Sequence, residues 1–261
     1  MDIHNTTIVV TGGGSGIGEG LCRRFKQEGA KNIIVADIVE SDAQRVASEI
    51  GGIPRTIDVT DESQIQALIQ KIETDIAPID IFCSNAGILC TDPDHAASSP
   101  NEDWDRLWKV NVLAHVFAAR HMLPHMLKRG NGYLLNTASA AGLLSQLGSA
   151  PYSVTKHASI GFAESLAIAH GDQGIKVSII CPQAVRSKMT LDIDTGLAKS
   201  AAGDGVLEPE QLAETVMQGI KEEQFLILPH LIVETYMKRK TDDYDRWLSG
   251  MRRFKNMLES Q

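Results

Sequence analysis

A tyrosine and a lysine stand four residues apart in the stretch YSVTK, as Tyr152 and Lys156. Residues at this spacing project from the same face of a helix. A neighbouring ammonium favours the ionised phenol and lowers the pKa of a tyrosine from its ordinary value of about 10. The spacing is also common in helices that have no chemical role, but it can make Tyr152 an acid–base group near neutral pH.

Two more polar residues precede this pair. Ser139 ends the apolar run LLNTAS, thirteen residues before Tyr152. In a parallel sheet the end of such a strand lies at the edge where ligands bind, so the Ser139 hydroxyl could hydrogen-bond a carbonyl oxygen that Tyr152 protonates. Asn111 lies inside the helical stretch WKVNVL, where an amide is a poor helix former. Asn111 is either tolerated on a surface or holds a water molecule that links Lys156 to solvent.

Five of the eight residues in TGGGSGIG, from Thr11 to Gly18, are glycines. They follow the apolar run TIVV and precede a helical pattern. In this setting backbone N–H groups and a helix N-terminus can bind a phosphate. The strict G-x-G-x-x-G fingerprint is absent in every register, and a glycine turn alone is weak evidence for a nucleotide site.

Acidic residues end the next two predicted strands. Asp37 closes NIIVAD, at the distance from the glycines where a carboxylate accepts hydrogen bonds from an adenosine ribose. Its charge would repel a 2′-phosphate, and its neighbours Ile38 and Ser15 supply no cation, although Asp37 could also be an ordinary turn residue. Asp58 is similarly placed to reach an adenine amino group. Together the two acids favour NAD(H) over NADP(H).

The elements that must position these residues alternate along the chain. Short apolar runs, which are predicted strands, are separated by longer stretches of helical period: TTIVVT, NIIVAD, PRTIDV, IDIFCSNAG, GYLLNTAS, IKVSIICP and a shorter FLILP. Continuous apolar strands with helices between them indicate a parallel sheet covered on both faces. The sequence therefore predicts an α/β fold, a single-domain doubly wound parallel sheet (Rossmann fold) of about seven strands with a C-terminal helical extension.

The domain organisation follows from this alternation. Residues 1–230 are expected to form a dinucleotide-binding and catalytic Rossmann domain, and residues 231–261 a helical extension of the same domain. The segment 231–258 has the pattern of one charged amphipathic helix, which would pack on the body or on a second subunit, with membrane-surface binding as a distant alternative. The segment 186–205 is polar and rich in small residues, as a mobile lid would be.

Composition limits the function classes. The 261 residues carry a net charge of −8, which argues against nucleic acid or an anionic membrane as the main partner. Four scattered cysteines fit free thiols in a reducing compartment, and neither a signal peptide nor a membrane span is evident, so we expect a cytoplasmic protein. His115, His121 and His125 could share a metal, but surface or interface histidines are favoured, and we expect no metal site.

Taken together, the motifs resemble the short-chain dehydrogenase/reductase family across residues 5–230. TGGGSGIG, SNAG at 84–87, Asn111, Ser139 and YSVTK match the family's motifs in order and spacing. The resemblance implies that Asn111, Ser139, Tyr152 and Lys156 form a catalytic tetrad. It also implies NAD as cofactor, bound by Gly12, Ser15, Gly16, Ile17, Gly18, Asp37, Asp58, Val59, Asn85, Gly87, Tyr152, Lys156, Pro182, Val185 and Ser187.

Two features depart from the family pattern. Pro182-Gln183 replaces the usual Pro-Gly after the sixth strand, which places the Gln183 side chain beside the nicotinamide, where it can contact substrate. The family's glycine-rich ending is replaced by FLILPH and the charged C-terminal segment. Segments 102–128 and 152–170 match helices that pair across a two-fold axis in relatives, which implies a homodimer or homotetramer.

We therefore expect an NAD(H)-dependent oxidoreductase that interconverts a secondary alcohol and a ketone. The alternatives are an NADP(H)-dependent carbonyl reductase, an NAD-bound epimerase or dehydratase, and a non-catalytic dinucleotide sensor. The expected pocket wall is mostly apolar without an evident cationic clamp, so it suits a neutral or weakly polar substrate. The expected substrate contacts are Ser139, Leu144, Tyr152, Gln183 and Met189, with Leu89, Ala140, Leu143 and Leu191 completing the wall.

Overall fold

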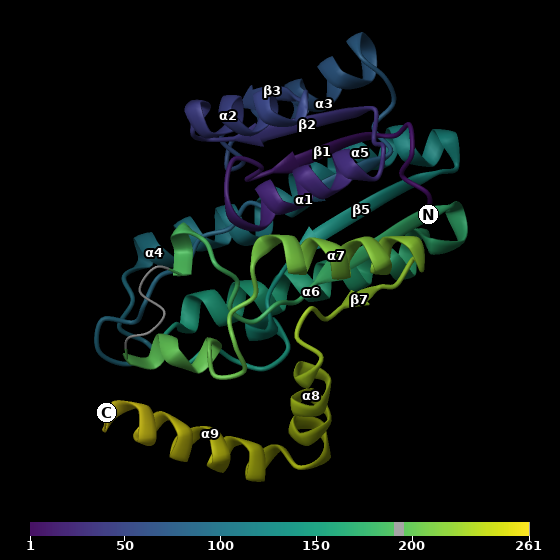
Figure 1. Ribbon diagram of the computed structural model, residues 1–261. Coiled ribbons are helices and arrows are strands. Elements are labelled where there is room, and N and C mark those ends of the chain that lie inside the picture. Colours follow the sequence, from purple (N-terminus) through teal and green to yellow (C-terminus); the bar gives the residue numbers. More distant parts are fainter. Residues whose placement is uncertain (191–195, 261) are drawn as a thin grey trace.

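The fold is built on one parallel sheet. The computed structural model describes residues 1–190 and 196–260 and contains seven strands in the order β3-β2-β1-β4-β5-β6-β7 (Figure 1). This arrangement confirms the predicted doubly wound Rossmann sheet. The strands are β1 (Thr7–Thr11), β2 (Asn32–Asp37), β3 (Ile53–Thr56), β4 (Ile81–Ser84), β5 (Gly132–Thr137), β6 (Ile175–Ile180) and β7 (Leu226–Ile227).

Seven helices alternate with the strands, and alternate strand residues bury against opposite layers. In β1, Ile8 and Val10 belong to the core cluster under α1, α2 and α7, whereas Val9 belongs to the cluster under α3, α5 and α6. This period of two explains why the strands read as continuous apolar runs. The helices are α1 (Gly16–Gln27), α2 (Glu40–Ile50), α3 (Glu62–Asp75), α4 (Asn101–Trp108), α5 (Ala114–Arg129), α6 (Ala150–His170) and α7 (Pro209–Lys221).

Two helix starts carry side-chain caps. The Asp61 side chain accepts a hydrogen bond from the Ser63 backbone N–H at the start of α3. At the start of α7, Glu208 and Gln211 form a reciprocal capping box. Such caps pair backbone N–H groups that the first helical turn leaves without partners, so they set where each helix begins.

Helices α4 and α5 are joined by one π-helical turn, Lys109–Leu113. Asn111 lies in this turn, and its backbone oxygen accepts a hydrogen bond of 2.6 Å from the Ser159 hydroxyl of α6. A π turn changes the direction in which its side chains project. The widened turn therefore fixes Asn111 against α6 instead of leaving it on a surface.

The C-terminal segment forms two helices, so the expectation of one helix over 231–258 was wrong. Helix α8 (Ile232–Asp242) and helix α9 (Tyr244–Glu259) are separated at Asp243, whose backbone is extended. The Asp243 carboxylate accepts a hydrogen bond from the Arg246 backbone N–H, 2.9 Å away, and thereby caps α9. The chain turns at this cap, and Figure 1 shows α9 running across the lower side of the body.

A buried lysine anchors this extension. Lys240 is only 7% exposed, and its Nζ donates to the backbone oxygens of Leu143 and Leu144 at 2.8 and 3.1 Å. The same ammonium lies 4.9 Å from the Trp247 ring centroid and 5.5 Å from that of Tyr244. Since an ammonium has three donors and is attracted to aromatic faces, one cation joins α8, α9 and the loop after β5.

No helix within the described ranges has the length and apolar character needed to cross a lipid bilayer.

Replacing Lys240 tests this anchor. Lys240→Met keeps the apolar stem but leaves two carbonyl oxygens and two rings without their cation. Hydrogen bonds to a charged group contribute about 1.5–3 kcal/mol, so amide hydrogen exchange in residues 232–259 should become at least about tenfold faster. The matched control is Lys238→Met on the same helix, where the lysine is exposed and pairs with Glu234. Equal exchange in both variants would show that Lys240 does not hold the extension.

Candidate active site

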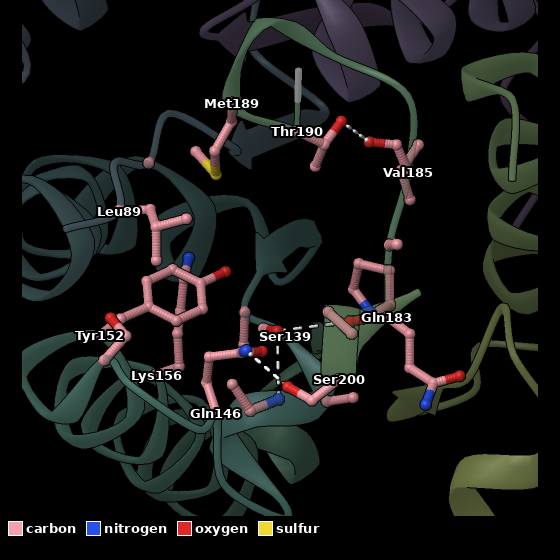
Figure 2. A pocket seen from close by; sticks show the side chains of 18 of the residues that line it. Leu89, Ser139, Gln146, Tyr152, Lys156, Gln183, Val185, Met189, Thr190 and Ser200 are labelled. Atoms are coloured by element: carbon pink, nitrogen blue, oxygen red, sulfur yellow. Dashed lines mark hydrogen bonds between the residues drawn. The ribbon is translucent and has the colours of Figure 1, made fainter. Parts of the chain in front are cut away.

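A cavity of about 1610 Å³ lies at the carboxyl edge of the sheet (Figure 2). Parallel strands end on the same edge, so residues far apart in the sequence meet there. Most of the residues singled out from the sequence line it. These are Gly12, Ser15, Gly16, Ile17, Asp37, Asp58, Val59, Asn85, Gly87, Leu89, Ser139, Ala140, Leu144, Tyr152, Lys156, Pro182, Gln183, Val185, Ser187 and Met189.

Three predicted residues do not line the cavity, and one cannot be placed. Gly18, Asn111 and Leu143 lie behind the wall, where they support residues that do line it. Leu191 lies outside the described residues, as does part of the proposed lid 186–205, so the lid stays a prediction. Within that segment, Lys188–Thr190 and Gly196–Ala201 form short 3₁₀ turns.

The glycines between β1 and α1 are required by close approaches of the chain. A Cβ on Gly18 would lie 2.0 Å from the Gly12 backbone oxygen, and one on Gly16 would lie 2.9 Å from the Ser187 Cβ. Gly12 and Gly16 also have φ of +62° and +50°, a region that side chains disfavour. The result is a cavity wall of bare backbone at the first turn of α1, with the positive end of the helix dipole behind it.

Asp37 ends β2 beside this turn. One carboxylate oxygen accepts the Gly14 N–H at 2.9 Å, and the other accepts the Val39 N–H at 3.0 Å. Asp37 therefore shapes the turn as well as facing the cavity. Each carboxylate oxygen can accept a second hydrogen bond, so both can still receive hydroxyl donors from a ligand.

Two cations lie near Asp37 that the sequence alone did not indicate. Arg45 of α2 donates to the Gly14 backbone oxygen at 2.9 Å and forms a 2.7 Å ion pair with Glu19. Lys188 lines the cavity and forms a 2.7 Å ion pair with Asp42. Both cations are therefore already paired with carboxylates.

Asp58 lies two residues beyond the end of β3, since that strand stops at Thr56 and not at the predicted position 59. Its carboxylate accepts hydrogen bonds from the backbone N–H and the hydroxyl of Thr60, at 2.9 and 2.8 Å. Asp58 and its neighbour Val59 both line the cavity. The loop after β3, held by the Asp58–Thr60 hydrogen bonds, therefore places Asp58 at the carboxyl edge of the sheet, as predicted.

Tyr152 and Lys156 lie side by side on α6, as the spacing predicts (Figure 2). The Lys156 Nζ is 5.6 Å from the centroid of the Tyr152 ring and donates to the Thr137 backbone oxygen at 3.2 Å. Lys156 is only 3% exposed. Ser139 follows β5, where its hydroxyl donates to the Pro182 oxygen at 3.3 Å and accepts the Ala141 N–H at 3.1 Å.

Burial dominates the titration of both groups. It raises the pKa of Tyr152 above its ordinary value, against a smaller opposing effect of the hydrogen bond from Ser139. It also lowers the pKa of Lys156 to about 8. The expected net lowering of the Tyr152 pKa is therefore wrong for the chain by itself. The physical reason is that desolvation disfavours both charged forms, and the Lys156 ammonium faces the ring of Tyr152.

Asn111 is buried, so the surface alternative for it is wrong. Its Nδ2 donates to the Ile88 oxygen at 3.0 Å and to the Thr155 hydroxyl at 3.1 Å, and its Oδ1 accepts the Ile88 N–H at 2.9 Å. Both amide donors are therefore used to hold the chain after β4. A Cβ on Gly87 would lie 3.3 Å from the Lys156 Nζ and 3.4 Å from the Asn111 Oδ1, so this glycine keeps the two groups close together.

Gln183 lines the cavity, but its side-chain amide is hydrogen-bonded to Asp204. Its Nε2 donates to Asp204 at 2.9 Å, and the Tyr236 hydroxyl donates to the other oxygen of the same carboxylate at 3.0 Å. Figure 2 shows the Gln183 amide directed away from Tyr152. This departure from the family's glycine therefore connects the loop after β6 to α8.

The extension supplies residues that sequence reasoning missed. Helices α8 and α9 contribute three arginines and several apolar side chains to the cavity, so the expectation of a wall without cations was wrong. The amphipathic pattern of the segment was visible, but its partner surface depends on the turn at Asp243 and on Lys240. The added lining residues are Tyr236, Arg239, Arg246, Trp247, Gly250, Met251, Arg253 and Phe254.

The three histidines considered as metal ligands have different environments. His115 is buried, and burial followed by the charge of Lys156 lowers its pKa to about 3, so it is not a surface histidine. His121 lies 3.0 Å from Glu62, and His125 lies 3.6 Å from Glu73. Within the described residues, no three potential ligand side chains gather at one point.

Comparison with known proteins agrees with this geometry. The family model described as short chain dehydrogenase matches residues 6–197. A meso-2,3-butanediol dehydrogenase of Serratia marcescens is 31% identical over 224 residues, which cover 82% of this chain and 86% of the relative. A 1-deoxy-11-beta-hydroxypentalenate dehydrogenase of Streptomyces exfoliatus is 30% identical over 255 residues, covering 95% and 92%.

A solved structure shows the same fold. The short-chain dehydrogenase/reductase of Burkholderia phymatum, crystallised in complex with NAD, has a TM-score of 0.85 to this chain, with 24% identity and coverage of 94% of this chain and 96% of that chain. At this identity the likeness concerns the fold alone. The family match over most of the chain, together with the two relatives, establishes that this chain belongs to the short-chain dehydrogenase/reductase family of oxidoreductases.

Proposed function

We propose that the chain is an NAD(H)-dependent oxidoreductase that interconverts a secondary alcohol and a ketone. The observation that carries this proposal is the position of Tyr152, which faces the cavity between Lys156 and Ser139. The names of the similar dehydrogenases support alcohol chemistry. A non-catalytic dinucleotide sensor would have no need of this arrangement of an acid, a cation and a hydroxyl.

The residues present fit a dinucleotide. The bare backbone at Gly12 and Gly16 leaves room for a pyrophosphate at the first turn of α1, and Asp37 offers carboxylate oxygens to an adenosine ribose. When bound, the cofactor accepts a hydride in alcohol oxidation and donates one in ketone reduction. We assign its binding to Gly12, Ser15, Gly16, Ile17, Gly18, Asp37, Asp58, Val59, Asn85, Gly87, Tyr152, Lys156, Pro182, Val185 and Ser187.

The tetrad has separate tasks in this proposal. Ser139 orients the substrate oxygen by redirecting its hydroxyl from the Pro182 oxygen, 3.3 Å away, to the substrate, while the Ala141 N–H polarises the hydroxyl. Tyr152 donates a proton to the oxygen of a ketone and takes one from an alcohol. We propose that, with cofactor and substrate bound, the Lys156 ammonium stabilises the phenolate that oxidation requires, an effect not seen in the chain by itself, where burial raises the pKa of Tyr152. Asn111 is a positioning residue, because its amide holds the Ile88 backbone beside Lys156.

The substrate residues that we propose are Ser139, Leu144, Tyr152, Gln183 and Met189, all of which line the cavity. We also propose a homodimer or homotetramer. Val154 and Ile168 of α6 are exposed apolar residues, at 46% and 86%, and Gly161 lies midway between them with open space around it. Spacings of seven place the three on one helix face, which supports pairing through α6.

Cofactor choice tests the assignment of Asp37. Because its carboxylate would face a 2′-phosphate and the nearby cations are paired, NADH should bind at least about tenfold more tightly than NADPH. Asp37→Asn keeps one side-chain oxygen that can accept a backbone N–H but removes the charge, so it should reduce the difference between NADH and NADPH affinity. Calorimetric titration with NADH and with NADPH measures this difference in affinity. The control is Asp75→Asn, which removes an exposed carboxylate at the end of α3. Equal or tighter NADPH binding by the unmodified chain would favour the NADP(H) alternative.

Tyr152→Phe tests the proton transfer. The variant keeps the ring and its packing but removes the ionisable hydroxyl. Turnover should fall by about 10²–10⁴-fold, the usual contribution of general acid–base catalysis. NADH affinity should change little, since the cofactor's other contacts remain. The control is Tyr133→Phe, which removes a buried hydroxyl bonded to Ser178 and remote from the cavity. Near-normal turnover in Tyr152→Phe would mean that the proton is transferred elsewhere.

The buried Lys156 predicts a pH-dependent stability. Its pKa is about 8 in the folded chain and 10.5 ordinarily, so between these values the unfolded chain binds more protons and unfolding becomes less favourable as pH rises. Relative to Lys156→Met, the native protein should therefore gain unfolding free energy on the order of 3 kcal/mol between about pH 7 and about pH 11.

Chemical denaturation of the chain without added cofactor across this pH range measures the effect. Lys128→Met, an exposed lysine at the end of α5, should show no such trend. A flat difference between the native protein and Lys156→Met would mean that the Lys156 ammonium is well solvated.

A further inference from the structure

The end of the cavity formed by α8 and α9 carries three positive charges. Arg239, Arg246 and Arg253 line it, and none of them forms an ion pair with a carboxylate in the described part of the chain. The Arg239 guanidinium lies over the aromatic face of Tyr236, 5.9 Å from the ring centroid. In a chain with a net charge of −8, this end of the cavity is locally positive.

The arginines on α9 lie on the face that borders the cavity. Arg246, Gly250 and Arg253 are separated by four and three residues, which places them on one side of a helix. A Cβ on Gly250 would meet nothing closer than the Arg253 Nη2 at 3.9 Å, so there is open space over Gly250 beside the Arg253 guanidinium. Arg252 does not line the cavity and donates to the Ser249 hydroxyl at 2.8 Å.

Two further carboxylates that line the cavity, Asp204 and Asp92, already accept hydrogen bonds from the protein. Asp204 accepts from Gln183 and Tyr236. Asp92 accepts from the Ser99 hydroxyl and from a backbone N–H at the start of α6. These two acids hold loops and helices in place, so they leave the arginines available to an external anion.

The distance from the arginines to Tyr152 is set by a fixed connection. Lys240 joins α8 and the aromatic residues of α9 to the backbone of Leu143 and Leu144, a few residues after Ser139. Leu144 lines the cavity together with Met251 and Phe254 of α9, so apolar surface lies near the arginines. A ligand reaching from Tyr152 to the arginines would therefore cross an apolar stretch.

We propose that the substrate is an amphipathic anion. Its alcohol or ketone lies at Tyr152, its apolar body against Leu144 and the inner face of α9, and its carboxylate or phosphate at Arg246 and Arg253, with Arg239 nearby. The planar guanidinium fork matches both anions in two-point hydrogen bonding. This inference rests on the proposed function, because it places the reacting group at Tyr152 in the same cavity.

The test uses hydroxy fatty acids of graded length, each with the hydroxyl on the carbon next to the terminal methyl, together with their methyl esters. Calorimetry on the full-length protein, with and without NADH, measures binding without requiring turnover. At one chain length the acid should bind at least about tenfold more tightly than its ester. The preference should shrink in high salt, because the guanidinium groups are exposed to solvent. The matching alkyl phosphate distinguishes a phosphate site from a carboxylate site.

Variants assign the effect to the arginines. The double variant Arg246→Gln and Arg253→Gln should bind acid and ester about equally, whereas Arg246→Lys with Arg253→Lys should keep part of the preference. Arg252→Gln, one residue away but off the cavity face, should keep all of it. Equal binding of acid and ester to the native protein, or the same loss in Arg252→Gln, would overturn the proposal. So would a change of oligomeric state in the double variant by light scattering, since the face would then be a subunit interface.

The outcomes separate this inference from the proposed function. Acid-selective binding that depends on the arginines, without any oxidation by NAD, would support the anion site and contradict the proposed dehydrogenase. Oxidation of acid and ester with the same KM would support the dehydrogenase and overturn the anion site.

Discussion

A chain of polar contacts at the carboxyl edge of the sheet holds the cavity together. The Asn85 Nδ2 donates to the Thr11 oxygen at 3.0 Å, and its Oδ1 accepts the Thr137 hydroxyl at 3.1 Å. The backbone oxygen of Thr137 in turn accepts from Lys156. One side chain thus connects β1, β4 and β5, and the last of these strands connects to α6. The glycine turn and the Tyr152 pair keep a fixed separation because both are attached to this network.

The same network explains how a lysine can be buried at this edge. An ammonium removed from water loses solvation that a single carbonyl oxygen replaces only in part, which is why the pKa of Lys156 is lowered to about 8. A protein selected for stability alone would place an apolar side chain there. Retaining a cation at some cost in stability is typical of functional sites, where charge is held ready for a ligand or a reacting group. With these shifts, Tyr152 stays protonated near neutral pH, whereas Lys156 keeps its proton less firmly than an exposed lysine does.

Local patterns predicted much of the fold and the site, and tertiary contacts account for the remainder. The apolar runs, the glycine turn and the Tyr152–Lys156 spacing are properties of neighbouring residues, so the parallel sheet and the residues at its edge could be predicted. The early end of β3 and the π turn at Asn111 depend on packing between distant segments. The turn at Asp243 was missed because an amphipathic pattern persists on both sides of a capping residue. Lys240 reads as an ordinary surface lysine until its contacts with the loop after β5 are seen.

The two ends of the cavity differ in both origin and charge. Asp37 and Asp58, at one end, come from the sheet that the family shares, whereas the arginines at the other come from the C-terminal extension. For the proposed cofactor and the proposed anionic substrate, opposite charges at the two ends would disfavour binding in the reversed orientation, since an anionic group would then lie beside a carboxylate. Lys240 fastens the extension to the loop after Ser139 through the Leu143 and Leu144 oxygens. The proposed anion site and the proposed catalytic residues are therefore joined by one buried side chain, although different parts of the chain supply them.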